Sequence, residues 1–227
     1  MTDDARADAP ADLPLEHVHV PPRAETDGPA PAVVVLHGRG ADEEDLLPVA
    51  RRLPDVLHVV SLRAPDRLMG GYTWYELDLS AGGLHQSQPH AAEFRRSLDA
   101  VSASVDAAVD GYGIDPDGVG LLGFSQGAIA ALALLVEAPG RWAWTAALHG
   151  YLAASHADRD VDLSGAPAFV AAGAADEVIP ASRSSAAADR LRELGADVTF
   201  ETFDASHGVG PDELAALVAF VEERVRD

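Results

Sequence analysis

Short apolar runs alternate with longer amphipathic segments along most of the chain. Residues 32–36 form a continuous apolar run with three β-branched valines, which is typical of a strand buried on both faces of a parallel sheet. Further strands are predicted at residues 56–62, 119–122, 142–148, 166–172 and 197–203, and helices at residues 46–53, 89–112, 128–136, 182–194 and 211–225. The alternation indicates right-handed βαβ crossovers. We therefore expect an α/β fold with a mostly parallel central sheet and helices on both faces.

The N-terminal part departs from this pattern. Residues 1–14 are acidic, contain proline and are short of large apolar side chains. They lack the basic start and hydrophobic core of a secretory signal, so a flexible acidic tail is the expectation. Residues 15–20 alternate in polarity and predict an edge strand. Residues 15–227 have a length that suits one α/β domain, and we expect a single domain there.

Charge narrows the classes of partner. The chain has 37 acidic and 16 basic residues, its formal net charge is -21, and every basic residue is arginine. Such a field repels the phosphates of nucleic acids and anionic membranes, and no apolar run approaches the ~18 residues of a membrane span. We therefore expect no nucleic-acid partner and no membrane span. The acidic excess is typical of proteins from salt-in halophiles, while a high-GC genome also accounts for arginine in place of lysine.

The chain contains no cysteine. Disulfides, thiolate catalysis and cysteine-based metal sites are therefore excluded. A cytoplasmic location is the default expectation.

Three side chains that could take part in catalysis, a serine, an aspartate and a histidine, follow predicted strands. Ser125 lies in the stretch G-F-S-Q-G, between the strand at 119–122 and the helix at 128–136. Asp176 follows the strand at 166–172, and His207 follows the strand at 197–203. Because functional loops gather at the carboxyl ends of parallel strands, we expect these three residues to converge. Serine, acid and histidine in this order are expected of an α/β-hydrolase.

The three residue types divide the work of nucleophilic catalysis. A serine hydroxyl is a poor nucleophile near neutral pH, so His207 would accept its proton and Asp176 would orient the imidazole. The developing oxyanion needs two donors. We predict the backbone N–H groups of Gln126, which follows the nucleophile, and of Arg39, in the glycine loop after the strand at 32–36.

Other interpretations of these residues stay open. Asp176 also fits a cap of the following helix, with Glu177 as the fallback acid, and His207 also fits an ordinary loop histidine. Trp74, in the long loop at 63–88, fits either a wall of the acyl pocket or simple core. His149 follows the strand at 142–148 and fits either substrate binding or structural packing.

Five stretches together resemble the phospholipase/carboxylesterase family of α/β-hydrolases, which includes acyl-protein thioesterases. They are residues 36–42 (L-H-G-R-G-A-D), 74–76 (W-Y-E), 123–127 (G-F-S-Q-G), 173–180 (G-A-A-D-E-V-I-P) and 206–208 (S-H-G). The resemblance places the family's triad on Ser125, Asp176 and His207 and its oxyanion donors on Arg39 and Gln126. Family members often carry an apolar residue in place of Arg39 and a small polar residue in place of His149.

The resemblance implies a serine carboxylesterase that hydrolyses small-molecule esters of short to medium acyl chains through an acyl-serine intermediate, with no metal and no organic cofactor. A homodimer is a further implication. The first alternative is a thioesterase or lysophospholipase acting on long acyl chains. The second alternative, from another class, is a non-catalytic ligand-binding protein on a hydrolase scaffold.

Overall fold

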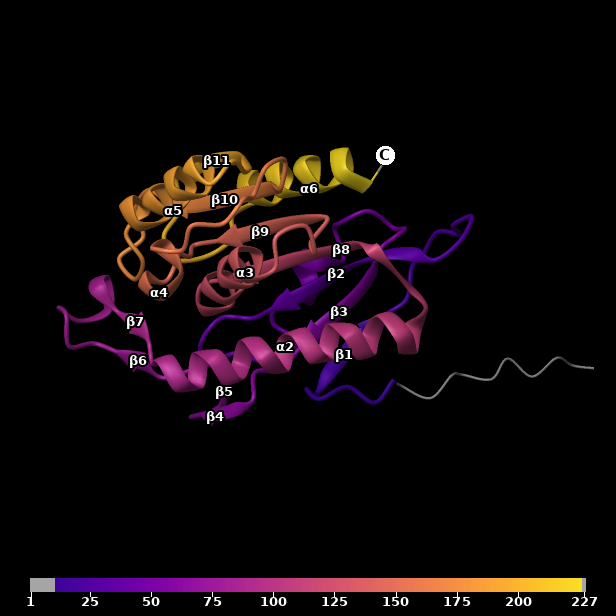
Figure 1. The fold of residues 1–227 in the computed structure, drawn as a ribbon, viewed down its shortest axis with the longest axis horizontal. Helices are drawn as coiled ribbons and strands as arrows, with labels where there is room; N and C mark the ends of the chain where they lie inside the picture. Colours follow the sequence, from indigo (N-terminus) through magenta and orange to yellow (C-terminus); the bar gives the residue numbers. More distant parts are fainter. Residues whose placement is uncertain (1–10, 226–227) are drawn as a thin grey trace, which may run out of the picture.

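A seven-stranded sheet crosses the whole molecule. The computed structural model describes residues 11–225. Its strands follow the order β1 (His17–Val20), β3 (His58–Leu62), β2 (Ala30–Leu36), β8 (Ile114–Phe124), β9 (Trp144–Leu148), β10 (Pro167–Gly173) and β11 (Asp197–Phe203). Edge strand β1 pairs antiparallel with β3, and all the other pairs are parallel. In Figure 1 the sheet runs from the indigo strands at one edge to the orange strands at the other.

Helices cover both faces of this sheet. Helices α2 (Ala91–Tyr112), α3 (Gln126–Glu137) and α5 (Ala181–Glu193) contribute to the apolar core on one face, and α1 (Leu47–Ala50) and α6 (Pro211–Val225) contribute to the core on the other. A short helix, α4 (Ala154–Ala157), lies beside α3. The predicted α/β architecture, with a mostly parallel sheet between two helical layers, is confirmed.

The central strand β2 shows why its sequence is apolar throughout. Val34 and Leu36 enter the core beneath α2 and α3, whereas Val33 and Val35 enter the core beneath α1 and α6. Successive side chains of a strand point to opposite faces, so a strand covered on both sides has no polar position to spare. Burial on both faces therefore explains why residues 32–36 are apolar at every position.

Two predicted segments differ from the observed ones. The helix expected at residues 46–53 is only the four-residue α1. After it the chain continues in turns, in which Arg52 and Leu53 donate to carbonyls three residues earlier, and Pro54 disfavours a helical conformation at Leu53. The long loop at 63–88 carries two small antiparallel pairs and a 3₁₀ turn. Their bounds are β4 (Asp66–Leu68) with β5 (Gly71–Thr73), β6 (Leu77–Asp78) with β7 (Gln88–Pro89), and η1 (Leu84–Gln86).

Most of the predicted acidic tail at residues 1–14 lies outside the described residues. In its described part, Ala11 donates its backbone N–H to the Tyr112 hydroxyl at 3.2 Å, and Leu13 packs against the core beside α2. Residues 11–14 therefore contact the body of the protein.

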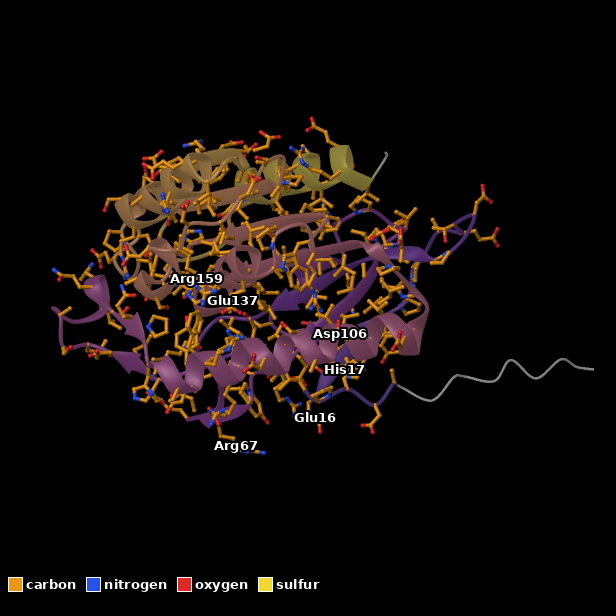
Figure 2. All side chains as sticks on the ribbon, in the orientation of Figure 1. Glu16, His17, Arg67, Asp106, Glu137 and Arg159 are labelled. Atoms are coloured by element: carbon orange, nitrogen blue, oxygen red, sulfur yellow. The ribbon has the colours of Figure 1, made fainter. Side chains whose placement is uncertain are left out.

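Charged side chains cover the outside of the fold, as Figure 2 shows. Several arginines pair with carboxylates, among them Arg159 with Glu137 at 3.2 Å, both labelled in that view. Within residues 11–225, none of the helices combines the length and hydrophobicity needed to cross a membrane.

Candidate active site

Ser125 occupies a strained turn between β8 and α3. Its backbone has φ 53° and ψ -114°, a region that residues with a Cβ rarely adopt. Two close approaches require the flanking glycines. A Cβ on Gly123 would lie 2.3 Å from the Gly127 carbonyl oxygen, and a Cβ on Gly127 would lie 2.0 Å from the Leu36 carbonyl oxygen. The G-x-S-x-G pattern is thus the sequence that permits α3 to start directly against β2 and β8.

The structure brings Ser125, His207 and Asp176 into one hydrogen-bonded chain. The Ser125 Oγ lies 2.9 Å from His207 Nε2, and His207 Nδ1 lies 2.7 Å from Asp176 Oδ2. Asp176 follows β10, and His207 lies in the loop between β11 and α6. The distances join residues that are 82 and 31 positions apart in the chain. The convergence expected from the strand ends is present.

The carboxylate of Asp176 accepts four hydrogen bonds. Its Oδ1 accepts the backbone N–H groups of Val178 and Ile179, at 2.8 and 2.9 Å, and its Oδ2 faces two imidazole nitrogens. Burial by itself raises the pKa of Asp176, but the bonds from His207, His149 and the two backbone groups outweigh burial and lower it. An ionised Asp176 assigns the proton to Nδ1 of His207, which leaves Nε2 free to accept the Ser125 proton.

Gln126, whose backbone N–H is a predicted oxyanion donor, begins a helix directly after Ser125. It is the first residue of α3, and the first N–H groups of a helix have no acceptor within the helix. The side chain of Gln126 forms hydrogen bonds with the long loop at residues 63–88. Its Oε1 accepts Thr73 Oγ1 and the Trp74 N–H, each at 3.0 Å, and its Nε2 donates to the Tyr75 carbonyl at 2.6 Å. Gln126 therefore fastens the long loop to the turn that carries Ser125.

The glycine loop after β2 lies beside the same serine. A Cβ on Gly38 would come within 3.7 Å of the Ser125 Cβ. The Gly40 N–H donates to the Tyr72 carbonyl at 2.7 Å, and a Cβ on Gly71 would come within 2.1 Å of the Gly40 carbonyl oxygen. The β4–β5 hairpin thus packs directly on the loop that carries Arg39, the second predicted oxyanion donor.

His37 fixes this loop from inside the protein. Its Nδ1–H donates to the Gly38 carbonyl at 2.7 Å, and its Nε2 accepts the Ala64 N–H at 3.0 Å. Burial lowers the pKa of His37, which agrees with a neutral ring that uses one nitrogen as donor and the other as acceptor. Trp74 adds a bond from Nε1 to the His37 carbonyl, at 2.9 Å.

A cavity of about 190 Å³ opens at Ser125. Arg39 and Gln126 line it together with apolar and aromatic side chains. The remaining lining residues are Leu77, Leu84, Ser87, Ile129, Tyr151, Val178 and Ile179. The serine, both predicted oxyanion donors and an apolar wall therefore share one cavity.

Trp74 and His149 do not line this cavity. Both are fully buried, with exposed fractions of 0%. Trp74 packs behind the glycine loop, and His149 Nδ1 lies 2.8 Å from Asp176 Oδ2 on the side away from the serine. The structure therefore gives no support to the expectation that these two side chains contact substrate.

Glu213, on the first turn of α6, belongs to the same cluster and was not singled out in the sequence. Its Oε2 lies 3.1 Å from His149 Nε2, and its exposed fraction is 0%. One signal was available. Glu213 lies four positions before Leu217 and eight before Val221, so a carboxylate occupies the apolar stripe of the helix.

His149, Asp176 and His207 are also the group that best matches a metal site among residues 11–225, because their candidate ligand atoms lie within 4.8 Å of one another. The Nδ1 atoms of both histidines already form hydrogen bonds with Asp176 Oδ2. A cation there would displace the bonds that orient His207.

Comparison with known proteins identifies the family. A sequence model of the family described as Phospholipase/Carboxylesterase matches residues 22–224. Acyl-protein thioesterase 1 of Aspergillus fumigatus is 27% identical over 155 residues, which cover 65% of this chain and 63% of that protein. The match thus spans less than two thirds of this relative's length.

Solved structures share the fold. The carboxylesterase of Mesorhizobium loti has a TM-score of 0.81 and 24% identity, covering 95% of this chain and 99% of that chain. The Bacillus cereus carboxylesterase has a TM-score of 0.79 and 22% identity, covering 92% and 94%. Because the family model matches residues 22–224, which are most of the chain, the chain belongs to the phospholipase/carboxylesterase family of serine hydrolases, which have the α/β-hydrolase fold.

Proposed function

We propose that the chain is a serine carboxylesterase that hydrolyses carboxylic esters of short to medium acyl chains through an acyl-serine intermediate. The observation that carries the proposal is the chain of hydrogen bonds from Ser125 Oγ through His207 to Asp176, at 2.9 and 2.7 Å. A serine bonded to a histidine that is itself bonded to a carboxylate is the arrangement that activates a hydroxyl near neutral pH.

The geometry supports the following steps. Ser125 Oγ attacks the ester carbonyl carbon while His207 Nε2 takes the hydroxyl proton, and the carbonyl π electrons move onto oxygen. The N–H groups of Arg39 and Gln126 stabilise that oxyanion. The C–O bond to the alcohol then breaks, and His207 returns the proton to the alcohol. Water, deprotonated by His207, then attacks the acyl carbon. The bond from that carbon to Ser125 Oγ breaks, His207 returns the proton to Oγ, and the acid leaves.

The cavity favours a short acyl group. At about 190 Å³ it is smaller than the ~300–1,000 Å³ typical of pockets for drug-sized ligands. Leu77, Ile129 and Ile179 form an apolar wall next to the serine. A compact apolar cavity accommodates a few methylene groups, and the rest of a long chain would have to lie outside it.

A second candidate, hydrolysis of long-chain thioesters or lysophospholipids, has one observation in its favour. Leu84 and Val178 line the cavity and are partly exposed, at 48% and 37%, so an apolar surface continues beyond the cavity. A long acyl chain has a place to lie there. The relative from Aspergillus fumigatus, named an acyl-protein thioesterase, is compatible with this candidate. The third candidate, a non-catalytic binding protein, predicts a disrupted triad, whereas the serine–histidine bond is intact.

An ester series separates these candidates. With p-nitrophenyl esters from acetate to palmitate, assayed in high salt, we expect kcat/KM to rise to a peak at butyrate to octanoate, because each methylene buried in the cavity gains about 0.8 kcal/mol. It should fall by at least about tenfold at palmitate, because a chain longer than the cavity has to bend out of it while the ester carbonyl stays at Ser125. The matched control is the same series with the thioesters of p-nitrothiophenol. A maximum at palmitate would favour the long-chain candidate, and no turnover of any ester would favour the binding protein.

We further propose that the protein is adapted to high salt. The net charge of -21 should produce self-repulsion that salt screens. The melting temperature is expected to rise by roughly 5 °C or more between low and multimolar KCl. At about pH 5, closer to the isoelectric point of about 4.5, the rise should be smaller because less charge remains to be screened. A melting temperature that does not change with KCl at neutral pH would contradict the adaptation.

The remaining expectations stay predictions. The negative net charge supports the absence of a nucleic-acid partner. A single domain over residues 15–227, a homodimer, a cytoplasmic location and catalysis without a cofactor await direct measurement.

A further inference from the structure

A second histidine binds the carboxylate that serves His207. His149 Nδ1 lies 2.8 Å from Asp176 Oδ2, and His207 Nδ1 lies 2.7 Å from the same oxygen atom. Behind His149, Glu213 Oε2 lies 3.1 Å from Nε2. The hydrogen-bonded chain therefore does not end at the acid but continues through two more residues, from Ser125 to Glu213.

We propose that His149 and Glu213 form a positioning pair that holds Asp176 and sets the pH range in which His207 acts as base. Neither residue contacts the cavity at Ser125, so both act through the carboxylate of Asp176. The proposal deepens the esterase function proposed above and rests on it.

The backbone conformation of His149 is unusual and is held by a hydrogen bond. It lies directly after β9 with φ 53°, in the left-handed region, and its N–H donates to the Ala171 carbonyl at 2.9 Å. This conformation is unfavourable for a residue other than glycine, and the ring of His149 bonds to Asp176 from it. His149 and Glu213 both have exposed fractions of 0%.

Asp176, His149 and Glu213 are buried and ionisable, so each hydrogen bond between them must contain one proton. The titratable groups that face His149 are Asp176 after β10, His207 in the β11–α6 loop and Glu213 on α6, and its ring also lies beside Phe124. Since Asp176 is an acceptor, Nδ1 of His149 carries a proton. The bond to Glu213 contains one further proton, so the His149–Glu213 pair is neutral as a unit.

We assign the shared proton to the ring of His149. Burial by itself lowers the pKa of His149, but the bonds to Glu213 and Asp176 outweigh burial and raise it. Among residues 11–225, Oε1 of Glu213 has no hydrogen-bond partner, so the bond to His149 is the contact that can stabilise a negative charge on this buried carboxyl group. A positively charged ring 2.8 Å from Asp176 then competes with His207 for the same oxygen atom.

The sign of the effect follows from this competition. Protonated His207 is stabilised by the negative charge of Asp176, and a cation on the same oxygen weakens that stabilisation. The protein should stay active at a lower pH, and removing His149 should move the acidic limb of the activity profile to higher pH.

The test variant is His149→Asn. Asparagine tolerates the left-handed backbone and keeps an amide donor near Asp176, but it cannot be protonated. In the pH profile of kcat/KM with a p-nitrophenyl ester, the midpoint of the acidic limb is expected to rise by about 1 pH unit. At the original midpoint kcat should fall about fivefold, while KM changes less than twofold because His149 does not line the cavity.

His156→Asn is the matched control. His156 is also buried, at 3% exposed, and its Nε2 lies 3.1 Å from Glu137 Oε1, the same separation as between His149 and Glu213. It lies on α4, against α3, and bonds to Glu137 and not to Asp176. This variant should lose stability without moving the acidic limb. A purely structural His149 would make the two variants behave alike, and an unmoved limb in His149→Asn would overturn the proposal.

Glu213 provides an independent variant. Glu213→Gln removes the carboxylate that keeps His149 charged, so the limb should move in the same direction as in His149→Asn. Because Glu213 reaches Asp176 only through His149, the double variant should equal His149→Asn alone. An additive shift in the double variant would mean that Glu213 acts by another route and would contradict the pair.

A readout that needs no turnover separates this proposal from the esterase proposal. In NMR titrations, the ring protons of His207 should respond at a higher pH in His149→Asn than in the parent chain. If the parent chain hydrolyses no ester and the NMR shift is present, the esterase function fails and the pair stands. If esters are hydrolysed and neither the limb nor the NMR signal moves, the pair fails and the esterase function stands.

Discussion

The Ser125→Ala variant should lose about a millionfold in kcat toward p-nitrophenyl butyrate, down to the background rate of the assay. The reason is that Ser125 Oγ is the one nucleophile at 2.9 Å from His207 Nε2, and without it no acyl-enzyme forms. The fold should persist, because alanine removes only a hydroxyl and the flanking glycines still permit the turn. Circular dichroism and a melting temperature near that of the parent chain would verify this.

A covalent probe makes the same test without substrate. A fluorophosphonate should modify the parent chain at Ser125, as mapped by peptide mass spectrometry, and should leave Ser125→Ala unmodified. Ser182→Ala, which alters an exposed serine on α5, is the control and should behave as the parent chain does. Hydrolysis by Ser125→Ala at the parent rate, or an adduct on another serine, would contradict the assignment of the nucleophile.

Asp176→Asn is expected to lower kcat by about 10⁴-fold while leaving KM nearly unchanged. The carboxylate accepts four hydrogen bonds, and an amide cannot accept all of them. If its oxygen serves Val178 and Ile179, its NH₂ group faces the imidazoles. His207 must then present an unprotonated Nδ1, which places its proton on Nε2, toward Ser125. In that tautomer it cannot accept the hydroxyl proton.

Glu177→Gln is the control for the acid. Glu177 is the next residue and the fallback acid, and it is exposed, whereas Asp176 is 8% exposed. This neighbouring variant should retain the activity of the parent chain. If Glu177→Gln were the inactive variant and Asp176→Asn the active one, the carboxylate assignment would be wrong. Fluorophosphonate labelling of Asp176→Asn should also slow, because attack by Ser125 depends on the same base.

The layers of helices and strands could be predicted because buried positions are apolar, and their spacing along the sequence differs between strands and helices. The run at residues 32–36 is apolar at every position since β2 is covered on both faces, and the helices follow with their own spacing. The boundaries were less predictable. Residues 46–53 have helical spacing, but turns on both sides of residues 47–50 and Pro54 limit α1 to four residues. Helix propensity along the sequence does not show how many residues of a short segment will be helical once it packs against the rest of the protein.

Topology also made the meeting of Ser125, Asp176 and His207 predictable. Each residue follows a strand, and parallel strands end at one edge of the sheet, so positions distant in sequence become neighbours without any knowledge of side-chain packing. The glycines at 123 and 127 are explained by the same local geometry, since the turn leaves no room for a Cβ.

Side-chain direction could not be read in the same way. His149 also follows a strand, yet a left-handed φ of 53° turns its ring away from the cavity and toward Asp176. Trp74 lies in the expected loop but points inward to His37, and Gln126 is fastened to that loop through its side chain. Each outcome depends on a backbone angle or on a partner more than 25 positions away.

Patterns along the chain were therefore sufficient for the layered α/β sheet and for the edge at which serine, acid and histidine meet, because these follow from hydrophobic periodicity and strand direction. The tertiary structure alone decided which polar groups share Asp176, which side chains line the cavity, and that Glu213 lies behind His149 at a separation of 64 positions. Those choices come from packing of loops and helix ends in three dimensions, where the direction of one buried side chain is determined by its neighbours and not by its place in the sequence.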